Sequence, residues 1–284
     1  CVHHREKLAV LSAYWPQALL VRDGFDARAA LDAVQRHAAA EHPGAWQWDG
    51  QRARALALNT AVDGSGRIEH GVAGDEVARC LTALPPAWRQ VGLLSLAFAE
   101  DFAIVDTRRG TLPWLAVALP SHWAPEEKIG LHFSSVHAPV ADNALLLKAA
   151  DTLMRMVGGV GGDSGTDRWE RFVWTITRQT RLHTHPQRCD PTPWPVHGSA
   201  EALAAQAQFR TERQTFIPLP ELMLAAFTIH VQVQRLADVL DTPQRVQALH
   251  GAIASMSPAV LAYRGLQGVR APLLKWLDER AGRG

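Results

Sequence analysis

The stretch FTIHVQVQRL, Phe227–Leu236, alternates apolar and polar residues more cleanly than any other part of the chain. In an extended strand, the apolar residues at every second position from Phe227 to Val233 lie on one side and the polar residues between them lie on the other. This period of two predicts a strand with one buried face and one polar face.

Further strands are predicted before this one. EDFAIVD (Glu100–Asp106) and LPWLAVALP (Leu112–Pro120) are short, rich in β-formers and separated by the turn-like RRGT, which predicts a hairpin. WERFVWTITRQ (Trp169–Gln179) and FRTERQTFIPL (Phe209–Leu219) bring the expected antiparallel sheet to about five strands.

Helical periodicity appears between and around the strands. ALLLKAADTLMRMV (Ala144–Val157) has the period of a core-facing helix and is followed by glycines. Similar patterns occur in ARAALDAVQRHAAA and GDEVARCLTAL near the start, and in PQRVQALHGAIASM and APLLKWLDERAG near the end. The fold class is therefore α+β, with a mainly helical extension over 1–90, a core over 91–240 and C-terminal helices over 241–284.

Composition excludes several classes of protein. The 284 residues carry a net charge of +1, which gives no field for nucleic acid or anionic lipid. The three cysteines are widely spaced and fit a reducing compartment better than a disulfide framework. No apolar run reaches the length of roughly 18 residues that a membrane helix needs. We expect a soluble, cytoplasmic protein.

Two short motifs favour ordinary loops. GGDSG (Gly161–Gly165) is similar to the loop around a serine-protease nucleophile, but a short glycine-rich string is common and this one ends a predicted helix. RLHTHP (Arg181–Pro186) could turn His183 and His185 to one side of a strand, as a metal site requires. An exposed polar loop is the favoured interpretation there.

The polar run RTERQT (Arg210–Thr215) permits two interpretations. On a strand, Arg210, Glu212 and Gln214 lie on one side and Arg213 on the other, so whichever side turns inward carries charge into a core. Buried charge is costly and is tolerated mostly at functional sites. An edge strand with both faces in water is the equally open alternative.

Two histidines lie five residues apart in EKIGLHFSSVHAPVADN (Glu127–Asn143), among apolar and small residues. A single histidine in such surroundings is more often a hydrogen-bonded core residue than a ligand. Spacing alone does not decide between these roles for His132 and His137.

The order of these motifs from about Glu100 to Leu266 resembles the haem-dependent oxidative N-demethylase family. The segments that carry the resemblance are EDFAIVD, LPSHWAPEEKIGLHFSSVHAPV, WERFVWTI, FRTERQTFIPLP, FTIHV and LAYRGL. The resemblance implies a PAS-like haem-binding fold and a monooxygenase that removes a methyl group from a small amine. It implies haem b as cofactor, O2 as co-substrate, and electrons from a separate flavin and iron–sulfur reductase.

The resemblance also implies site residues. His137 is the expected proximal ligand of the haem iron. His132 is the second candidate, and His183 and His185 are the third. Glu212 and Arg213 are the expected catalytic residues, which share one pocket only if their strand is twisted or bulged.

Arg171 and Trp174 are expected at the cofactor, in a strand where the family usually has Arg-x-Asn-Trp and this chain has Val173 at the asparagine position. That departure keeps open a haem-free protein that binds another small molecule. A haem-based sensor is a second alternative, because the same fold class commonly senses ligands and fold alone does not decide function. Homodimer formation also stays open.

Overall fold

The strand with the cleanest alternation pairs along its whole length with the strand before it. β10 (Leu224–Arg235) and β9 (Gln208–Leu219) form an antiparallel hairpin whose register is unbroken from Leu224↔Leu219 to Arg235↔Gln208. Ile229 and Val231 are buried, while Gln232 and Gln234 are exposed. The predicted division of β10 into a buried and a polar face is confirmed.

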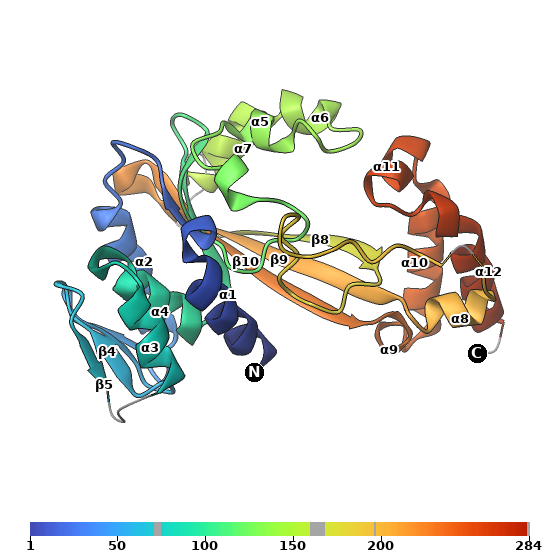
Figure 1. The fold of residues 1–284 in the computed structure, drawn as a ribbon. Helices are drawn as coiled ribbons and strands as arrows, with labels where there is room; N and C mark the ends of the chain where they lie inside the picture. Colours follow the sequence, from blue (N-terminus) through green and yellow to red (C-terminus); the bar gives the residue numbers. More distant parts are fainter. Residues whose placement is uncertain (71–74, 160–167, 196, 283–284) are drawn as a thin grey trace.

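These strands belong to a six-stranded antiparallel sheet in the order β1-β7-β6-β10-β9-β8 (Figure 1). The structure is a computed structural model that describes residues 1–70, 75–159, 168–195 and 197–282. The α+β class is confirmed. The other strands are β1 (Leu19–Val21), β6 (Asp101–Asp106), β7 (Thr111–Ala116) and β8 (Trp169–Thr177). β1 is the strand that the estimate of about five omits, because three residues are too few to show a period.

β6 and β7 form the predicted hairpin, and all of β6 is buried, because strands flank it on both sides and its two faces pack against separate hydrophobic clusters. Gly110 lies in the turn with φ +65°, and a Cβ there would approach Nε2 of His132 to 2.5 Å. Glycine is therefore required at this turn for both backbone conformation and space.

The helices inserted between β7 and β8 cover one face of the sheet. They are α5 (Phe133–His137), α6 (Ala144–Lys148) and α7 (Ala150–Val157), preceded by the 3-10 turn η2 (Pro125–Glu127). Met154 and Val157 pack with Val105 and Ala225 of the sheet. The predicted single helix over 144–157 is thus two helices that meet at Ala149, and GGDSG lies outside the described residues.

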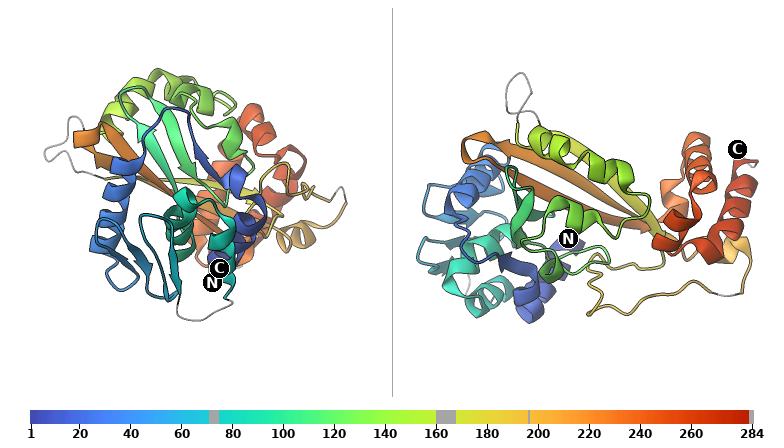
Figure 2. Two further views of the ribbon diagram at one scale, coloured as in Figure 1. Left: turned by 60° about the vertical axis from the view of Figure 1, so that its left-hand side comes forward. Right: turned by 90° about the horizontal axis from the view of Figure 1, so that it is seen from above.

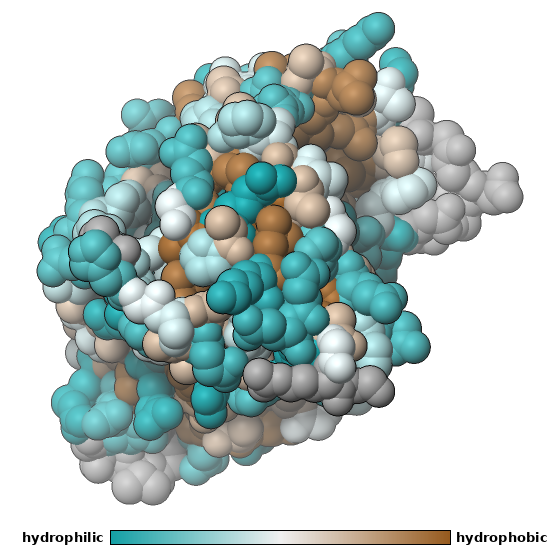
Figure 3. Space-filling model, turned by 90° about the vertical axis from the view of Figure 1, so that its right-hand side faces the viewer, coloured by the Kyte–Doolittle hydropathy of each residue, from teal (hydrophilic) through white to brown (hydrophobic). Residues whose placement is uncertain are grey.

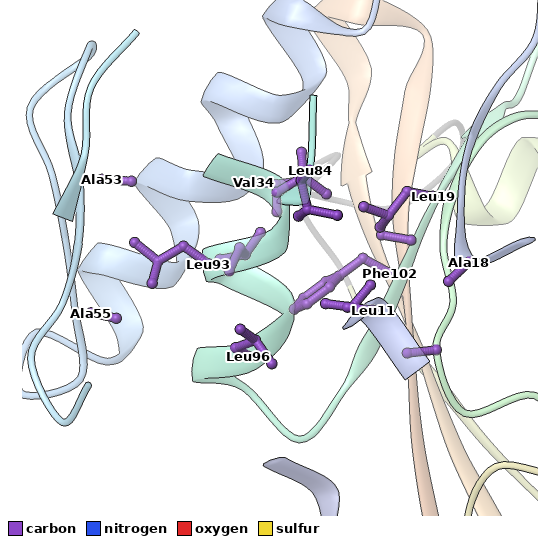
Figure 4. Close-up of a cluster of buried hydrophobic side chains, with 14 of the residues drawn as sticks. Leu11, Ala18, Leu19, Val34, Ala53, Ala55, Leu84, Leu93, Leu96 and Phe102 are labelled. Atoms are coloured by element: carbon purple, nitrogen blue, oxygen red, sulfur yellow. The ribbon is translucent and has the colours of Figure 1, made fainter. Parts of the chain in front are cut away.

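The N-terminal part of the chain packs on the opposite face. Its elements are α1 (Val2–Ala18), α2 (Arg28–Glu41), α3 (Glu76–Ala83), η1 (Pro86–Trp88), α4 (Arg89–Ala97) and a second sheet of β2 (Trp46–Trp48), β3 (Ala53–Ala55), β4 (Thr60–Val62) and β5 (Ile68–His70). Leu11 and Leu93 share a core with Phe102 of β6 (Figure 4). The prediction of a mainly helical segment over 1–90 overlooks these strands, each only three residues long.

The C-terminal helices pack at the far end of β8, β9 and β10 (Figure 2). They are α8 (Ala200–Ala204), α9 (Leu236–Val239), α10 (Pro243–Ser255), α11 (Pro258–Tyr263) and α12 (Arg270–Ala281), with η4 (Gln267–Val269) as a short turn. The turn η3 (Pro220–Leu222) lies at the opposite end of the hairpin, between β9 and β10. Ile253, Leu273 and Trp276 centre a separate core there. None of the helices in the described part of the chain has the length and hydropathy of a bilayer span.

Candidate functional site

The two histidines of EKIGLHFSSVHAPVADN lie at opposite ends of α5. His132 is the N-cap: its Nδ1 accepts a hydrogen bond from the Ser134 backbone N–H at 3.2 Å. Its Nε2 side faces the turn at Gly110. Because Nδ1 accepts at the start of the helix, the Nε2 that faces this turn carries the proton of the neutral ring, so His132 is a capping residue and a poor reserve ligand.

His137 ends α5 and has one ring nitrogen free. Its Nδ1 lies 2.9 Å from the carbonyl oxygen of Phe133, one helical turn earlier. A carbonyl oxygen can only accept, so Nδ1 carries the proton and the lone pair is on Nε2. Nε2 makes no hydrogen bond to any residue that the structure describes. This neutral tautomer is the form in which histidine binds a metal.

The surroundings of His137 favour that neutral form. Burial lowers the pKa of His137, the hydrogen bond to Phe133 opposes this shift, and the positive charges of Arg171 and Lys128 lower the pKa further. The ring also packs against Phe133, with centroids 4.1 Å apart. An imidazole that is neutral at physiological pH offers its lone pair without first losing a proton.

A row of polar side chains crosses β8 and β9 on one face of the sheet. Arg171 and Gln214 are register partners, and Glu212 lies two residues before Gln214 on the same side of β9. The Arg171 Nε donates to Gln214 Oε1 at 2.6 Å, and Gln214 Nε2 donates to Glu212 Oε2 at 2.7 Å. Gln214 is only 7% exposed. The amide thus links a guanidinium to a carboxylate.

Helices enclose this face from two sides. Figure 1 shows α5, α6 and α11 on the same side of β8–β10, and the Ser257 hydroxyl before α11 donates to Asp142 before α6 at 2.5 Å. Three of the surrounding elements expose a large apolar side chain: Leu145 on α6, Val173 on β8 and Tyr263 on α11. Hydrophobic surface is visible from the C-terminal side of the molecule (Figure 3). Apolar exposure of this kind marks ligand or partner sites.

A sequence model described as haem-dependent oxidative N-demethylase, alpha subunit-like, matches residues 27–274. The chain belongs to this family. The match begins in front of α2 and leaves out α1, so α2, the small sheet, α3 and α4 are part of the family sequence, which the resemblance from Glu100 onward did not include.

The residues present fit the haem on which the demethylase family depends. Among the described residues, no group of three or more His, Cys, Asp or Glu side chains could hold a metal ion. Haem iron needs no such group, because the porphyrin supplies the in-plane ligands and the protein adds one axial nitrogen. His137 has that nitrogen, and the apolar side chains on α6 and β8 suit a macrocycle.

The structure separates the two expected catalytic residues of the demethylase. β9 keeps an unbroken register with both neighbours, so Glu212 and Arg213 point to opposite faces. Arg213 is half exposed and lies near the carboxylates of Glu100 at 3.4 Å and Glu170 at 3.8 Å. No bulge that would bring Arg213 beside Glu212 interrupts this strand, and Arg171 on β8 is an arginine on the Glu212 side of the sheet.

Arg171 and Trp174 are also separated, since three residues along a regular strand reverse the side. Trp174 stacks on Phe209 with centroids 5.6 Å apart, and the Arg264 guanidinium lies 4.9 Å from its ring centroid. Trp174 packs with the C-terminal helices. Its position favours an anchor for those helices over a cofactor contact beside Arg171.

The prediction of an exposed loop at RLHTHP is wrong. His183 and His185 are 5% and 1% exposed, and their rings stack with centroids 6.1 Å apart. His183 Nδ1 donates to the Ala118 carbonyl at 2.8 Å, and His185 Nε2 lies 3.1 Å from both carboxylate oxygens of Glu126. The Glu6 carboxylate on α1 accepts from the backbone N–H of His183 at 2.8 Å. Side-chain partners from distant segments offset the cost of burying this polar loop.

This loop covers Arg210, which is 1% exposed and lies two residues before Glu212 on the same side of β9. Its guanidinium donates to the Ser121 hydroxyl at 2.8 Å and to the carbonyls of Arg181 and Leu182 at 2.9 and 2.6 Å. Burial lowers the pKa of Arg210 to about 10, against the opposing charge of Glu212. The face that carries Glu212 is therefore the inward one.

Two cavities lie away from this face. One of about 510 Å³ is lined by Arg5, Glu76 and Cys80 between α1 and α3, and one of about 310 Å³ by Glu201, Asp241 and Trp276 near α8, α10 and α12. None of the expected site residues lines either cavity. The candidate site is therefore defined by the side chains on β8 and β9 and not by either of these cavities.

Gln214 is the site residue that the sequence analysis missed. A neutral amide in a polar strand has no chemical signal of its own, and its importance comes from its cross-strand position opposite Arg171. The alternation that groups it with Arg210 and Glu212 was the available signal, but sequence cannot show which strand lies alongside.

Proposed function

We propose that this protein is a haem-dependent monooxygenase that removes a methyl group from a small amine. The overall reaction converts the N-methyl amine, O2, two electrons and two protons into the demethylated amine, formaldehyde and water. Family membership supports the haem-dependent class, and the inward face of β8 and β9 supports an amine as substrate.

The observation that carries the proposal is the tautomer of His137. Its Nδ1–H is held by Phe133, which fixes the ring and directs a free Nε2 lone pair toward a ligand. His137 would hold the iron of haem b, and Leu145 and Val173 would contact the macrocycle. When bound, haem supplies the oxygen chemistry that oxidises the N-methyl carbon.

The protein's own groups bind and orient the amine. At neutral pH a small alkyl amine is a cation, and a carboxylate in a partly desolvated site is the natural partner for it. Glu212 has one oxygen engaged by Gln214 and the other without a described hydrogen bond. That free oxygen would accept the amine N–H, while Arg171 and Gln214 keep the carboxylate in position.

We expect the electrons to come from another protein. Iron–sulfur clusters are held by four ligands, most often cysteine thiolates, and the chain has three cysteines far apart. The description of the family as alpha subunit-like supports partner subunits. A flavin and iron–sulfur reductase is the partner we propose, and a homodimer stays a prediction.

Formaldehyde release tests the proposal. The haem-loaded protein, supplied with a surrogate reductant and O2, should release formaldehyde from an N-methyl amine, and the Glu212→Gln variant should release much less while keeping its haem. A wild-type protein that binds haem but yields no formaldehyde from any of a broad panel of amines would favour the sensor alternative.

A further inference from the structure

The row of Arg171, Gln214 and Glu212 is more elaborate than an amine site requires. One carboxylate is enough to bind a small cationic amine. Here a guanidinium lies at the other end of the same row, and Gln214 donates to the carboxylate while accepting from the guanidinium. The buried amide prevents the two charges from collapsing into a direct ion pair, and it presents a cation and an anion side by side.

The guanidinium of Arg171 has unused donors. Only its Nε makes a hydrogen bond to a described residue, and neither it nor Glu212 forms an ion pair within the described parts of the chain. Burial lowers the pKa of Arg171, and the charge of Glu212 only partly opposes this shift. A desolvated guanidinium with free terminal nitrogens is the usual partner of a carboxylate.

A second buried cation adds to the positive charge on this face. Arg210 is hydrogen-bonded only to neutral acceptors, the Ser121 hydroxyl and two backbone carbonyls. Within the row, Arg171 and Arg210 carry two positive charges and Glu212 carries one negative charge, and the Glu6 carboxylate on α1 offsets part of the charge of Arg210. A ligand that brings a negative charge as well as an ammonium group would balance the face better than a plain amine.

An apolar group lies between the charges. Val173 is the register partner of Glu212 and lies two residues after Arg171, on the same side of β8. A valine beside the carboxylate suits the methyl group of a bound N-methyl ammonium, which has no hydrogen bond to offer.

We propose that this row binds a zwitterionic N-methylated amino acid, with its carboxylate on Arg171 and its methylated ammonium on Glu212. The inference rests on the proposed function, because it names the substrate class of that site. The matched comparison is between N-methylglycine and N-methylethylamine, which share the N-methyl group and differ in the carboxylate.

Calorimetric titration of the full chain with these two probes tests the proposal. Wild type should bind N-methylglycine more tightly, and Arg171→Gln should weaken that binding roughly 10- to 100-fold, the range expected for a charged hydrogen-bonded pair. The same variant should weaken N-methylethylamine far less, because Glu212 and its bond from Gln214 remain. Glu212→Gln should weaken both probes. Arg108→Gln, an exposed turn residue, is the matched arginine control and should change neither.

Equal affinity of wild type for the two probes would overturn the proposal. Loss of haem from Arg171→Gln, seen as a lost Soret band at unchanged fold, would also overturn it, because Arg171 would then anchor a haem propionate. Failure of the proposed function is distinguishable: a wild type without haem that still binds N-methylglycine through Arg171 would refute demethylation and retain this binding site.

Discussion

Arg210 and Arg213 lie three residues apart on the same strand and face opposite environments. Arg210 is fully buried, with three hydrogen bonds from its guanidinium and no carboxylate in direct contact. Arg213 is half exposed and lies near two carboxylates. The exposed arginine thus has the ion pairs, and the buried one has only neutral acceptors.

This difference shows which side of β9 is committed to function. An exposed ion pair costs little to form and contributes little, because water screens both charges. A buried guanidinium with only neutral acceptors is costly, and such arrangements are retained mostly where charge is used. The side of the sheet that buries Arg210 also carries Glu212, Gln214 and Arg171.

The largest effect should come from Arg210. Replacing it by alanine removes three hydrogen bonds, leaves two carbonyls without their donor and opens a cavity, so we expect a loss of roughly 3–5 kcal/mol in the free energy of unfolding. Urea denaturation measures this loss. A change below about 1 kcal/mol would show that the buried side carries no special cost.

Trp174 should show a smaller effect that separates packing from cofactor binding. Trp174→Ala removes the stacking on Phe209 and the contact with Arg264, and we expect a loss of about 2–3 kcal/mol with haem binding retained. Thermal unfolding and the Soret absorbance of the same sample measure both. A variant that keeps its stability but loses haem would show that Trp174 contacts the cofactor.

The loop over Arg210 gives the buried side a pH dependence. Burial lowers the pKa of His183 below its usual 6.5, and the hydrogen bond to Ala118 opposes this only in part. Below pH 6.5 the unfolded chain therefore binds a proton that the folded chain resists, so stability falls as the pH drops. His183→Asn keeps a donor for Ala118 and should give a shallower fall in stability between pH 7 and 5 in urea titrations. An unchanged slope would assign the pH dependence to other histidines.

The smallest effect should come from Arg213. Arg213→Gln removes only partly exposed ion pairs, so we expect a change within about 0.5 kcal/mol in stability and no change in amine binding. Calorimetry with an N-methyl amine, alongside Arg171→Gln, checks the second part. A large loss of binding in Arg213→Gln would reverse the assignment of the two faces.

Much of the sheet could be predicted, because β8, β9 and β10 are long enough to show their period. β1 and the small N-terminal sheet could not, since their strands have three residues each. These short strands form because of their pairing with other strands, which a local sequence pattern does not show.

The site was predicted in part for similar reasons. Strand parity already separated Glu212 from Arg213, but only the unbroken register excluded a bulge between them. His183 and His185 looked like an exposed loop because their partners, Ala118 and Glu126, lie far away in the sequence. The resemblance already gave His137 as the expected ligand ahead of His132, but the sequence could not show the hydrogen bonds of α5 that distinguish a cap from an imidazole with a free nitrogen.

The visible absorption spectrum of the haem-supplied protein, oxidised and dithionite-reduced, tests the central claim most directly when His137→Ala and His132→Ala are measured beside wild type. We predict a Soret band in wild type that is lost or shifted in His137→Ala. His132→Ala should keep the band and lose about 1 kcal/mol of stability as a removed helix cap. A band unchanged in His137→Ala, or absent from wild type, would contradict the assignment of His137 as the ligand of the haem iron.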